Sequence, residues 1–237
     1  MLYFHEKTPD GFNCRLVDEV LCHQKTKYQT VTIVKHANLG KTLYLDGCFQ
    51  ADDSFQEEYH ASMVAAAGNV WVHPDPPKDI LIIGSGPGGL AKAVHEIYPE
   101  AQILGIELDR EAFNLYKKYV PDWGPPTGWE YDLRFEDAFR FVRTEARESW
   151  DIILWDIDID TCASPAMFSQ ATVSLAHCYR ILKRNGVFVA TAGAIQERDA
   201  HAPYTKLLDH LKLLFEGYYG MKELTRMNWN FFQARKK

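Results

Sequence analysis

The sequence predicts an α/β fold, in which a small antiparallel β domain precedes a parallel sheet with helices on both faces. Three observations predict it. From about residue 80 onward, apolar strand-like runs alternate with helical segments, a pattern typical of parallel sheets. A glycine turn, Gly84–Gly89, follows the first of these strands, and Glu107 ends the second, 23 positions after Gly84. The first 56 residues instead show the alternation and the turn residues of β-hairpins.

Strand chemistry dominates the N-terminal region. Runs that are rich in β-branched residues, or that partly alternate in polarity, cover residues 15–22, 28–34 and 41–47. Asn38-Leu39-Gly40 predicts a hairpin turn between the last two runs. An alanine-rich helix is expected at 57–67, and the prolines of 73–77 predict a stiff linker after it.

The remaining chain alternates strands with helices. Strands are expected at 80–83, 102–106, 131–135, 152–155 and 187–191, and helices at 89–98, 110–119, 138–146, 166–182 and 201–215. Two adjacent strand-like runs, 218–224 and 228–234, predict an antiparallel edge hairpin. We therefore expect an N-terminal β domain over residues 1–56 and a Rossmann-like domain over residues 57–237.

Composition excludes several classes of partner. A net charge of −6 and a pI near 5.8 argue against a nucleic-acid backbone as ligand. The sequence has no apolar run of membrane-helix length and no signal-peptide pattern at its first residues, so we expect a cytoplasmic protein. Its five cysteines have no CxxC spacing and are expected to be reduced thiols. The spacing of the histidines predicts no metal site.

The glycine turn and Glu107 together predict a nucleotide site. Glycines let the backbone turn tightly and approach a ligand, and an acid at the tip of the second strand can accept from ribose hydroxyls. This unit is shared by proteins that bind NAD and proteins that bind S-adenosylmethionine (SAM), so the pattern alone leaves both open. The expected contacts around it are Gly84, Ser85, Gly86, Gly88, Glu107 and Leu108.

Two more acids follow strand ends and also suit the capping of a helix. Asp137 lies between the third strand and a helix, where it would serve as N-cap and could accept from an adenine amine, with Ala138 beside it. Asp109 suits either a ligand contact or the N-cap of the next helix.

Three acids alternate where the fourth strand ends. Asp156, Asp158 and Asp160 would face one way if the strand continued, at the edge where ligands bind in open α/β sheets. Their mutual repulsion would raise at least one pKa, which suits a general base. Asp156 is the expected base, Asp158 is expected to assist it, and Asp160 is expected to bind the substrate; an acidic loop without a catalytic role is the alternative.

The chain resembles the spermidine synthases, which are aminopropyltransferases with a SAM-methyltransferase-like domain. The resemblance extends from about Val17 to Val189. Its markers are the segments that begin at Lys27 (KYQ), Leu43 (LYLDGCFQ), Glu58 (EYH), His73 (HP), Leu81 (LIIG), Ile106 (IELD), Glu136 (EDAF) and Asp151 (DIILWD).

This resemblance implies roles for individual residues. Glu107 would bind the ribose hydroxyls and Asp137 the adenine amine, with Gln29 near the nucleoside. Asp156 would match the family's catalytic acid, which deprotonates the attacking amine. Tyr59 and His60 would line the acceptor pocket, and Trp229 is a further expected acceptor contact.

The chain also departs from the family pattern. The family loop reads Gly-Gly-Gly-Asp-Gly-Gly, and Pro87 stands where its aspartate would face the amine end of decarboxylated SAM. Losing that acid removes a repulsion toward the carboxylate of SAM itself. The family's second acceptor acid falls on Ile159, so Asp158 and Asp160 are the candidates to replace that acid. The family's late proline- and tyrosine-containing polyamine loop has no counterpart.

We therefore expect a SAM-dependent transferase without a metal, first of all a methyltransferase that acts on a small amine or a related nucleophile. Aminopropyl transfer from decarboxylated SAM and aminocarboxypropyl transfer from SAM are the alternatives. A non-catalytic nucleoside-binding protein is a further one, and the resemblance disfavours NAD. A homodimer is the expected assembly.

Overall fold

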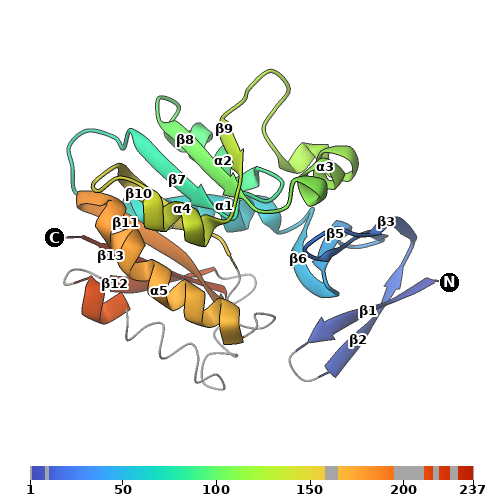
Figure 1. The fold of residues 1–237 in the computed structure, drawn as a ribbon. Helices are drawn as coiled ribbons and strands as arrows, with labels where there is room; N and C mark the ends of the chain where they lie inside the picture. Colours follow the sequence, from blue (N-terminus) through green and yellow to red (C-terminus); the bar gives the residue numbers. More distant parts are fainter. Residues whose placement is uncertain are drawn as a thin grey trace.

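The structure is a computed structural model and describes residues 2–8, 11–157, 165–194, 211–215, 219–224 and 229–236. Figure 1 shows a large sheet flanked by helices and, at the end of the molecule opposite the C-terminus, a smaller sheet that contains the N-terminus. Asp158 and Asp160, which are predicted to assist the base and to bind the substrate, lie outside the described residues, as does most of the helix expected at 201–215.

The N-terminal sheet has six strands: β1 (Leu2–Thr8), β2 (Gly11–Val17), β3 (Glu19–Lys25), β4 (Thr30–His36), β5 (Gly40–Leu45) and β6 (Cys48–Asp52). Their order is β2-β1-β6-β5-β4-β3. β1 and β6 had not been predicted. The run expected at 15–22 is divided at Asp18, where the backbone bends and the Asp18 N–H donates to the Lys35 carbonyl (2.8 Å).

The large sheet has seven strands in the order β12-β13-β11-β10-β7-β8-β9. They are β7 (Asp79–Ile83), β8 (Gln102–Glu107), β9 (Asp132–Phe135), β10 (Trp150–Trp155), β11 (Leu182–Ala194), β12 (Tyr219–Leu224) and β13 (Trp229–Arg235). β7 to β11 are parallel, and β13 runs antiparallel to both β11 and β12. This last pair is the predicted edge hairpin.

Helices cover both faces of the large sheet. They are α1 (Gln56–Val70), α2 (Gly89–Ile97), α3 (Arg110–Tyr119), α4 (Ala138–Thr144) and α5 (Pro165–Ile181), with a short 3₁₀ turn, η1 (Pro121–Trp123). The strand side chains alternate between the two faces: Leu81 and Ile83 join the cluster under α4 and α5, whereas Ile80 and Ile82 pack under α1 and α2. Because both faces are buried, the inner residues of the central strands β7, β8 and β10 are apolar.

A third apolar cluster joins the two sheets. Ile33 and Leu43 of the small sheet pack with Tyr116 of α3 and with Trp123 of η1, and all four side chains are buried. This contact places the turn between β3 and β4 beside the carboxyl end of β8. One cysteine expected to be reduced, Cys48, is instead disulfide-bonded in the structure.

Candidate active site

The glycine turn lies at the carboxyl end of β7, as predicted. Gly84, Gly86 and Gly88 have φ values of 84°, 49° and 96°, a region that favours glycine. A Cβ on Gly84 would lie only 2.7 Å from the carbonyl oxygen of Asp156. The inner side of the turn therefore fits closely against the end of β10, and it leads directly into α2.

Glu107 closes this turn from the tip of β8. Its carboxylate accepts from the Gly86 N–H (2.9 Å) and from the Asp109 N–H (2.9 Å). Burial raises the pKa of Glu107, whereas these backbone hydrogen bonds oppose that shift. A carboxylate that already accepts from two donors at a sheet edge can exchange one of them for a ribose hydroxyl. Leu108 follows it with its side chain 44% exposed, and it offers an apolar surface at the same edge.

Asp137 is the N-cap of α4. Its Oδ1 accepts from the N–H groups of Phe139 (2.8 Å) and Arg140 (3.3 Å), which confirms the capping role. Both of these hydrogen bonds reach the same oxygen, and the side chain is exposed. The second oxygen is thus oriented away from the cap, and the adenine contact stays a prediction. Ala138, the first residue of the helix, is buried behind it.

Asp156 and Tyr59 meet at the carboxyl end of β10. The Tyr59 hydroxyl donates to Asp156 Oδ1 over 2.5 Å. Burial raises the pKa of Asp156 to about 7, and the hydrogen bond from Tyr59 opposes the shift. An acid with a pKa near neutrality can accept a proton at physiological pH and release it again. The expected base and one expected acceptor contact are therefore brought together from distant parts of the sequence.

Gln29 reaches this edge from the N-terminal sheet. Its Nε2 donates to Asp109 Oδ2 (3.3 Å), and the Thr26 hydroxyl donates to the same oxygen (2.5 Å). Asp109 is also the N-cap of α3 and accepts from the Ala112 N–H (3.0 Å). Of the two roles open to Asp109, the structure shows the N-cap. The same side chain also joins α3 to the N-terminal sheet, two residues from Glu107.

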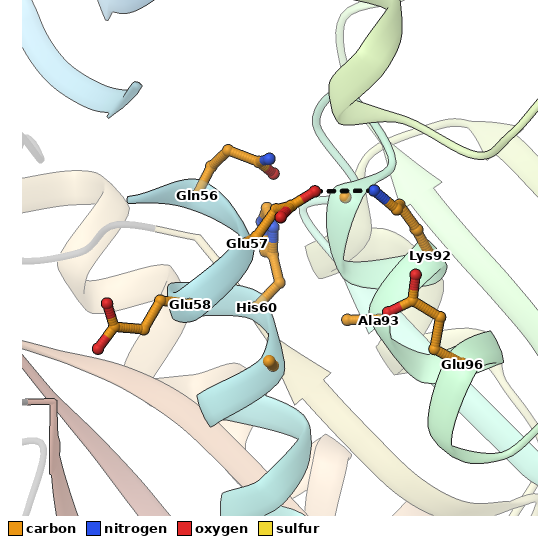
Figure 2. A pocket seen from close by; sticks show the side chains of 9 residues that line it. Gln56, Glu57, Glu58, His60, Lys92, Ala93 and Glu96 are labelled. Carbon is orange, nitrogen blue, oxygen red and sulfur yellow. Dashed lines mark hydrogen bonds and ion pairs between the residues drawn. The ribbon is translucent and has the colours of Figure 1, made fainter. Parts of the chain in front are cut away.

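His60 points elsewhere than its neighbour Tyr59. Figure 2 shows it in a groove between α1 and α2, close to the Lys92–Glu57 ion pair (3.0 Å). A Cβ on Gly89 would lie 2.6 Å from its Nδ1, which has no hydrogen-bond partner among the described residues. Burial lowers the pKa of His60 to about 4. The groove, of about 350 Å³, is lined by Gln56, Glu57, Glu58, His60, Ala61, Gly89, Lys92, Ala93 and Glu96. An acceptor contact of His60 remains a prediction.

The other expected acceptor contacts are not described at the level of side chains. Trp229 begins β13 and pairs through its backbone with Leu224 and Ala194. Within the described residues, no three side chains of His, Cys, Asp and Glu gather as ligands of a metal ion. None of the helices described here is long and apolar enough to cross a membrane.

One contact on the outside of the glycine turn has no signal in the sequence. The Tyr131 hydroxyl and Ser85 Oγ are 2.7 Å apart. Tyr131 was predicted only as the first residue of a strand, and nothing in its sequence neighbourhood indicates which residue it would contact.

Comparison with known proteins identifies the family. The sequence profile described as "Spermine/spermidine synthase domain" matches residues 56–218, and the one described as "Spermidine synthase tetramerisation domain" matches residues 2–53. The polyamine aminopropyltransferase of Prochlorococcus marinus is 27% identical over 92% of this chain and 76% of that relative. The polyamine aminopropyltransferase of Caldicellulosiruptor saccharolyticus is 32% identical over 80% of this chain and 66% of that one. For polyamine aminopropyltransferase 1 of Aquifex aeolicus, the identity is 29% over 77% of this chain and 64% of that protein.

Solved structures agree with the fold. A spermidine synthase in complex with the transition-state analogue AdoDATO and the spermidine synthase from Thermotoga maritima both align with a TM-score of 0.85. Each alignment covers 100% of this chain and 80% of that chain, at 19% and 20% identity respectively. They confirm the predicted α/β class, a Rossmann-like sheet of the SAM-methyltransferase type with an N-terminal antiparallel β domain.

The curated relatives correct one expectation. They carry the name of the aminopropyltransferase alternative, and none of the relatives above supports the methyltransferase that was expected first. The resemblance inferred from the sequence motifs is confirmed, since the synthase-domain profile alone matches well over half of the residues. The chain belongs to the spermine/spermidine synthase family.

Proposed function

We propose that this protein transfers the aminopropyl group of decarboxylated SAM to a small amine. The observation that carries the proposal is the pair of Asp156 and Tyr59, in which an acid with a pKa of about 7 lies at the same sheet edge as Glu107 and the glycine turn. The names of the curated relatives support it. An amine substrate is protonated at neutral pH, so a base beside it is what the reaction requires.

The chemistry requires little beyond positioning and one base. The nitrogen lone pair of the acceptor forms a bond to the aminopropyl carbon next to sulfur, and the electrons of the broken C–S bond return to the sulfonium. Methylthioadenosine leaves, and the proton lost by the nitrogen passes to Asp156. Because the sulfonium is already activated, holding the two reactants in line supplies a large part of the rate enhancement.

The nucleoside half of the donor is assigned to groups at the sheet edge. We propose that Glu107 gives up its hydrogen bond from the Gly86 N–H and accepts from ribose hydroxyls instead. Asp137 would accept from the adenine amine with the oxygen that does not cap α4. Leu108 would cover the base, and Gln29 would approach the nucleoside from the N-terminal sheet.

Pro87 favours a second candidate, transfer from SAM itself. The turn from Gly84 to Gly89 carries no charged side chain, so it offers no repulsion to a ligand carboxylate. With such a donor, the group transferred would be aminocarboxypropyl or methyl. The released nucleoside separates methyl transfer, which leaves S-adenosylhomocysteine, from the two propyl transfers, which both leave methylthioadenosine. The donor that is consumed separates those two from each other.

A product assay tests the proposal. The purified protein is incubated with either donor and a panel of short diamines, and the nucleoside and the amine are identified by mass spectrometry. We expect methylthioadenosine and an aminopropylated amine from decarboxylated SAM alone. Methylthioadenosine from SAM would establish aminocarboxypropyl transfer instead. Binding of both nucleosides without any product would favour the non-catalytic alternative.

Two variants connect the assay to the site. Asp156→Asn should lower turnover by about 10²- to 10³-fold, because the amide cannot take up the proton, while donor binding is retained. Asp132→Asn is the matched control: Asp132 is an exposed acid at the start of β9 that pairs with Arg134 (3.1 Å), and its loss should leave turnover unchanged. Equal turnover of Asp156→Asn and the wild type would remove Asp156 as the base.

We also propose that residues 2–53 mediate the assembly of copies of this chain. The profile that matches them is described as a tetramerisation domain. Tyr3, Phe12 and Leu16 of the β1–β2 hairpin are 59%, 69% and 53% exposed, and Tyr3 pairs directly with Leu16 across the two strands. Large apolar side chains exposed near one another are typical of an interaction surface. The homodimer predicted from the sequence and a tetramer are distinguished by light scattering.

A further inference from the structure

Tyr131 packs against the outside of the glycine turn. Its hydroxyl lies 2.7 Å from the hydroxyl of Ser85, a side chain that is only 3% exposed. Its ring covers Gly105 in the middle of β8, where a Cβ would lie 2.7 Å from Tyr131 Cε2 and 2.8 Å from Ser85 Oγ. Glycine inside a strand usually weakens it and often marks a close approach. Here the absence of a side chain on Gly105 makes room for the Tyr131–Ser85 pair.

The Tyr131 hydroxyl also leaves little space beside Gly88, at the end of the turn that leads into α2. A Cβ on Gly88 would lie 3.3 Å from the Tyr131 hydroxyl and 2.8 Å from Cδ of Pro125. A Cβ on Gly124 would lie 2.6 Å from the carbonyl oxygen of Pro87. The segment that leads into β9 therefore covers the outer side of the turn, while its inner side contacts the end of β10.

Stacked rings fix the orientation of the phenol. The Tyr131 ring lies nearly parallel to that of Trp129 (centroids 5.7 Å apart, 19° between planes), and Trp129 stacks on His95 of α2 (4.3 Å, 27°). Burial raises the pKa of Tyr131 to about 12, although the hydrogen bond with Ser85 opposes this shift. The hydroxyl therefore stays protonated at physiological pH.

We infer that Tyr131 is a positioning residue for the donor: through Ser85 it holds the glycine turn in the conformation that presents the Gly86 N–H and Glu107 to the nucleoside. Three glycines with positive φ form this turn, and glycine loses more conformational freedom on ordering than any other residue. A turn that is already ordered binds its ligand without that entropic cost. A disordered turn binds only during the fraction of time in which it adopts the binding conformation. The inference rests on the proposed function for the identity of the ligand.

Equilibrium binding of methylthioadenosine tests it, since this nucleoside lacks the group that is transferred. Tyr131→Phe keeps the ring and removes one hydroxyl, and we expect the dissociation constant of methylthioadenosine to rise about 2- to 13-fold, the range of one net hydrogen bond. The KM for the donor should rise in the same proportion. Because the reacting atoms are untouched, kcat and the KM for the amine should stay within about twofold.

The partner and a control make the test specific. Ser85→Ala should weaken methylthioadenosine binding to a similar degree, and the double variant should be no weaker than either single one, because both remove the same hydrogen bond. Tyr179→Phe is the control, because Tyr179 lies on α5, on the other face of the sheet. This variant should bind methylthioadenosine with the affinity of the wild type. Additive losses in the double variant, or an unchanged affinity in Tyr131→Phe, would overturn the inference.

Hydrogen exchange separates this inference from the proposed function. In the protein without ligand, the backbone amides of Gly84, Ser85, Gly86 and Gly88 should exchange faster in Tyr131→Phe than in the wild type, while those of β10 should not change. If the wild type binds no adenosyl compound, the proposed function fails, and the exchange rates still decide whether Tyr131 orders the turn. Equal exchange rates would contradict the inference.

Discussion

The Tyr59 hydroxyl donates to Asp156 across 2.5 Å, and so connects the second turn of α1 to the carboxyl end of β10. Tyr59 is held there by its contacts with Phe55 (centroids 5.6 Å apart) and Phe231 (5.1 Å). The apolar surroundings raise the pKa of the acid, while the phenol stabilises its ionised form. The balance of these two effects sets the pH at which Asp156 can act as a base.

The first prediction concerns the pH dependence of turnover. Only the ionised form of Asp156 can take a proton from the amine, and its pKa is about 7. The value of kcat/KM should therefore rise with pH through about 7, and the acid limb should be absent from the residual activity of Asp156→Asn. A pH–rate profile with saturating donor measures this. A limb that persists in the variant would assign the titration to another group.

Tyr59→Phe should move that limb to higher pH. The substitution removes a hydrogen bond to the ionised carboxylate, which is worth about 1.5–3 kcal/mol for a charged acceptor, so the pKa of Asp156 should rise by about one to two units. Activity at pH 6 should then fall more than activity at pH 9. Tyr179→Phe also removes a phenol hydroxyl, but on α5 at the other face of the sheet, so the same profile should keep its midpoint in that control. An equal loss at all pH values would indicate that Tyr59 does not tune Asp156.

Asp156→Asn should make the protein more stable even though it loses activity. The pKa of Asp156 is raised from 3.8 to about 7 on folding, so the folded state holds this proton more tightly than the unfolded chain. The contribution of the residue to stability is therefore greatest at low pH, falls as pH rises from about 4 to about 7, and stays low above that. At pH 8, the uncharged variant should gain about 1–3 kcal/mol in free energy of unfolding.

Urea denaturation at pH 8 and at pH 5 measures this gain. The difference between Asp156→Asn and the wild type should shrink at the lower pH, where the native carboxyl is largely protonated. If Asp156→Asn is less stable than the wild type at both pH values, burying the ionised Asp156 carboxylate does not destabilise the folded protein.

Gly84→Ala and Gly128→Ala form a matched pair. Both residues have positive φ, 84° and 90°, so each substitution costs about 1 kcal/mol of backbone strain. A Cβ on Gly84 would also meet the Asp156 carbonyl at 2.7 Å, whereas a Cβ on Gly128 would have no atom within 4 Å. Gly84→Ala should therefore cost more stability, by about 1–3 kcal/mol, and should weaken nucleoside binding. Equal effects would show that the turn moves away from β10 without cost.

The sequence predicted the parts of the site that follow from topology. A glycine turn after β7, Glu107 at the tip of β8 and Asp156 at the end of β10 meet because parallel strands bring their carboxyl ends to one edge. The large sheet was predictable for the same reason, since its strands are apolar runs between regular helices.

What the sequence did not predict depends on packing between distant segments. His60 follows Tyr59 directly, yet a helix turns successive side chains by about 100°, so one reaches Asp156 and the other the groove beside Gly89. The contact of Tyr131 with Ser85 depends on the path of the segment between η1 and β9, which has no periodic pattern. The strand β1 was missed because its alternation is weak and most of its side chains are exposed.

The last prediction concerns the contact between the two sheets. Thr26 is buried and donates to Asp109 Oδ2 (2.5 Å), and it also accepts from the N–H of Gln29 (3.1 Å). Thr26→Val keeps the shape and leaves the buried carboxylate without this donor, so the free energy of unfolding should fall by about 1–3 kcal/mol. Thr26→Ser retains the hydroxyl and should lose much less. Because Asp109 donates its own N–H to Glu107 (2.9 Å), Thr26→Val should also weaken nucleoside binding; an unchanged affinity would show that the N-terminal sheet does not position Glu107.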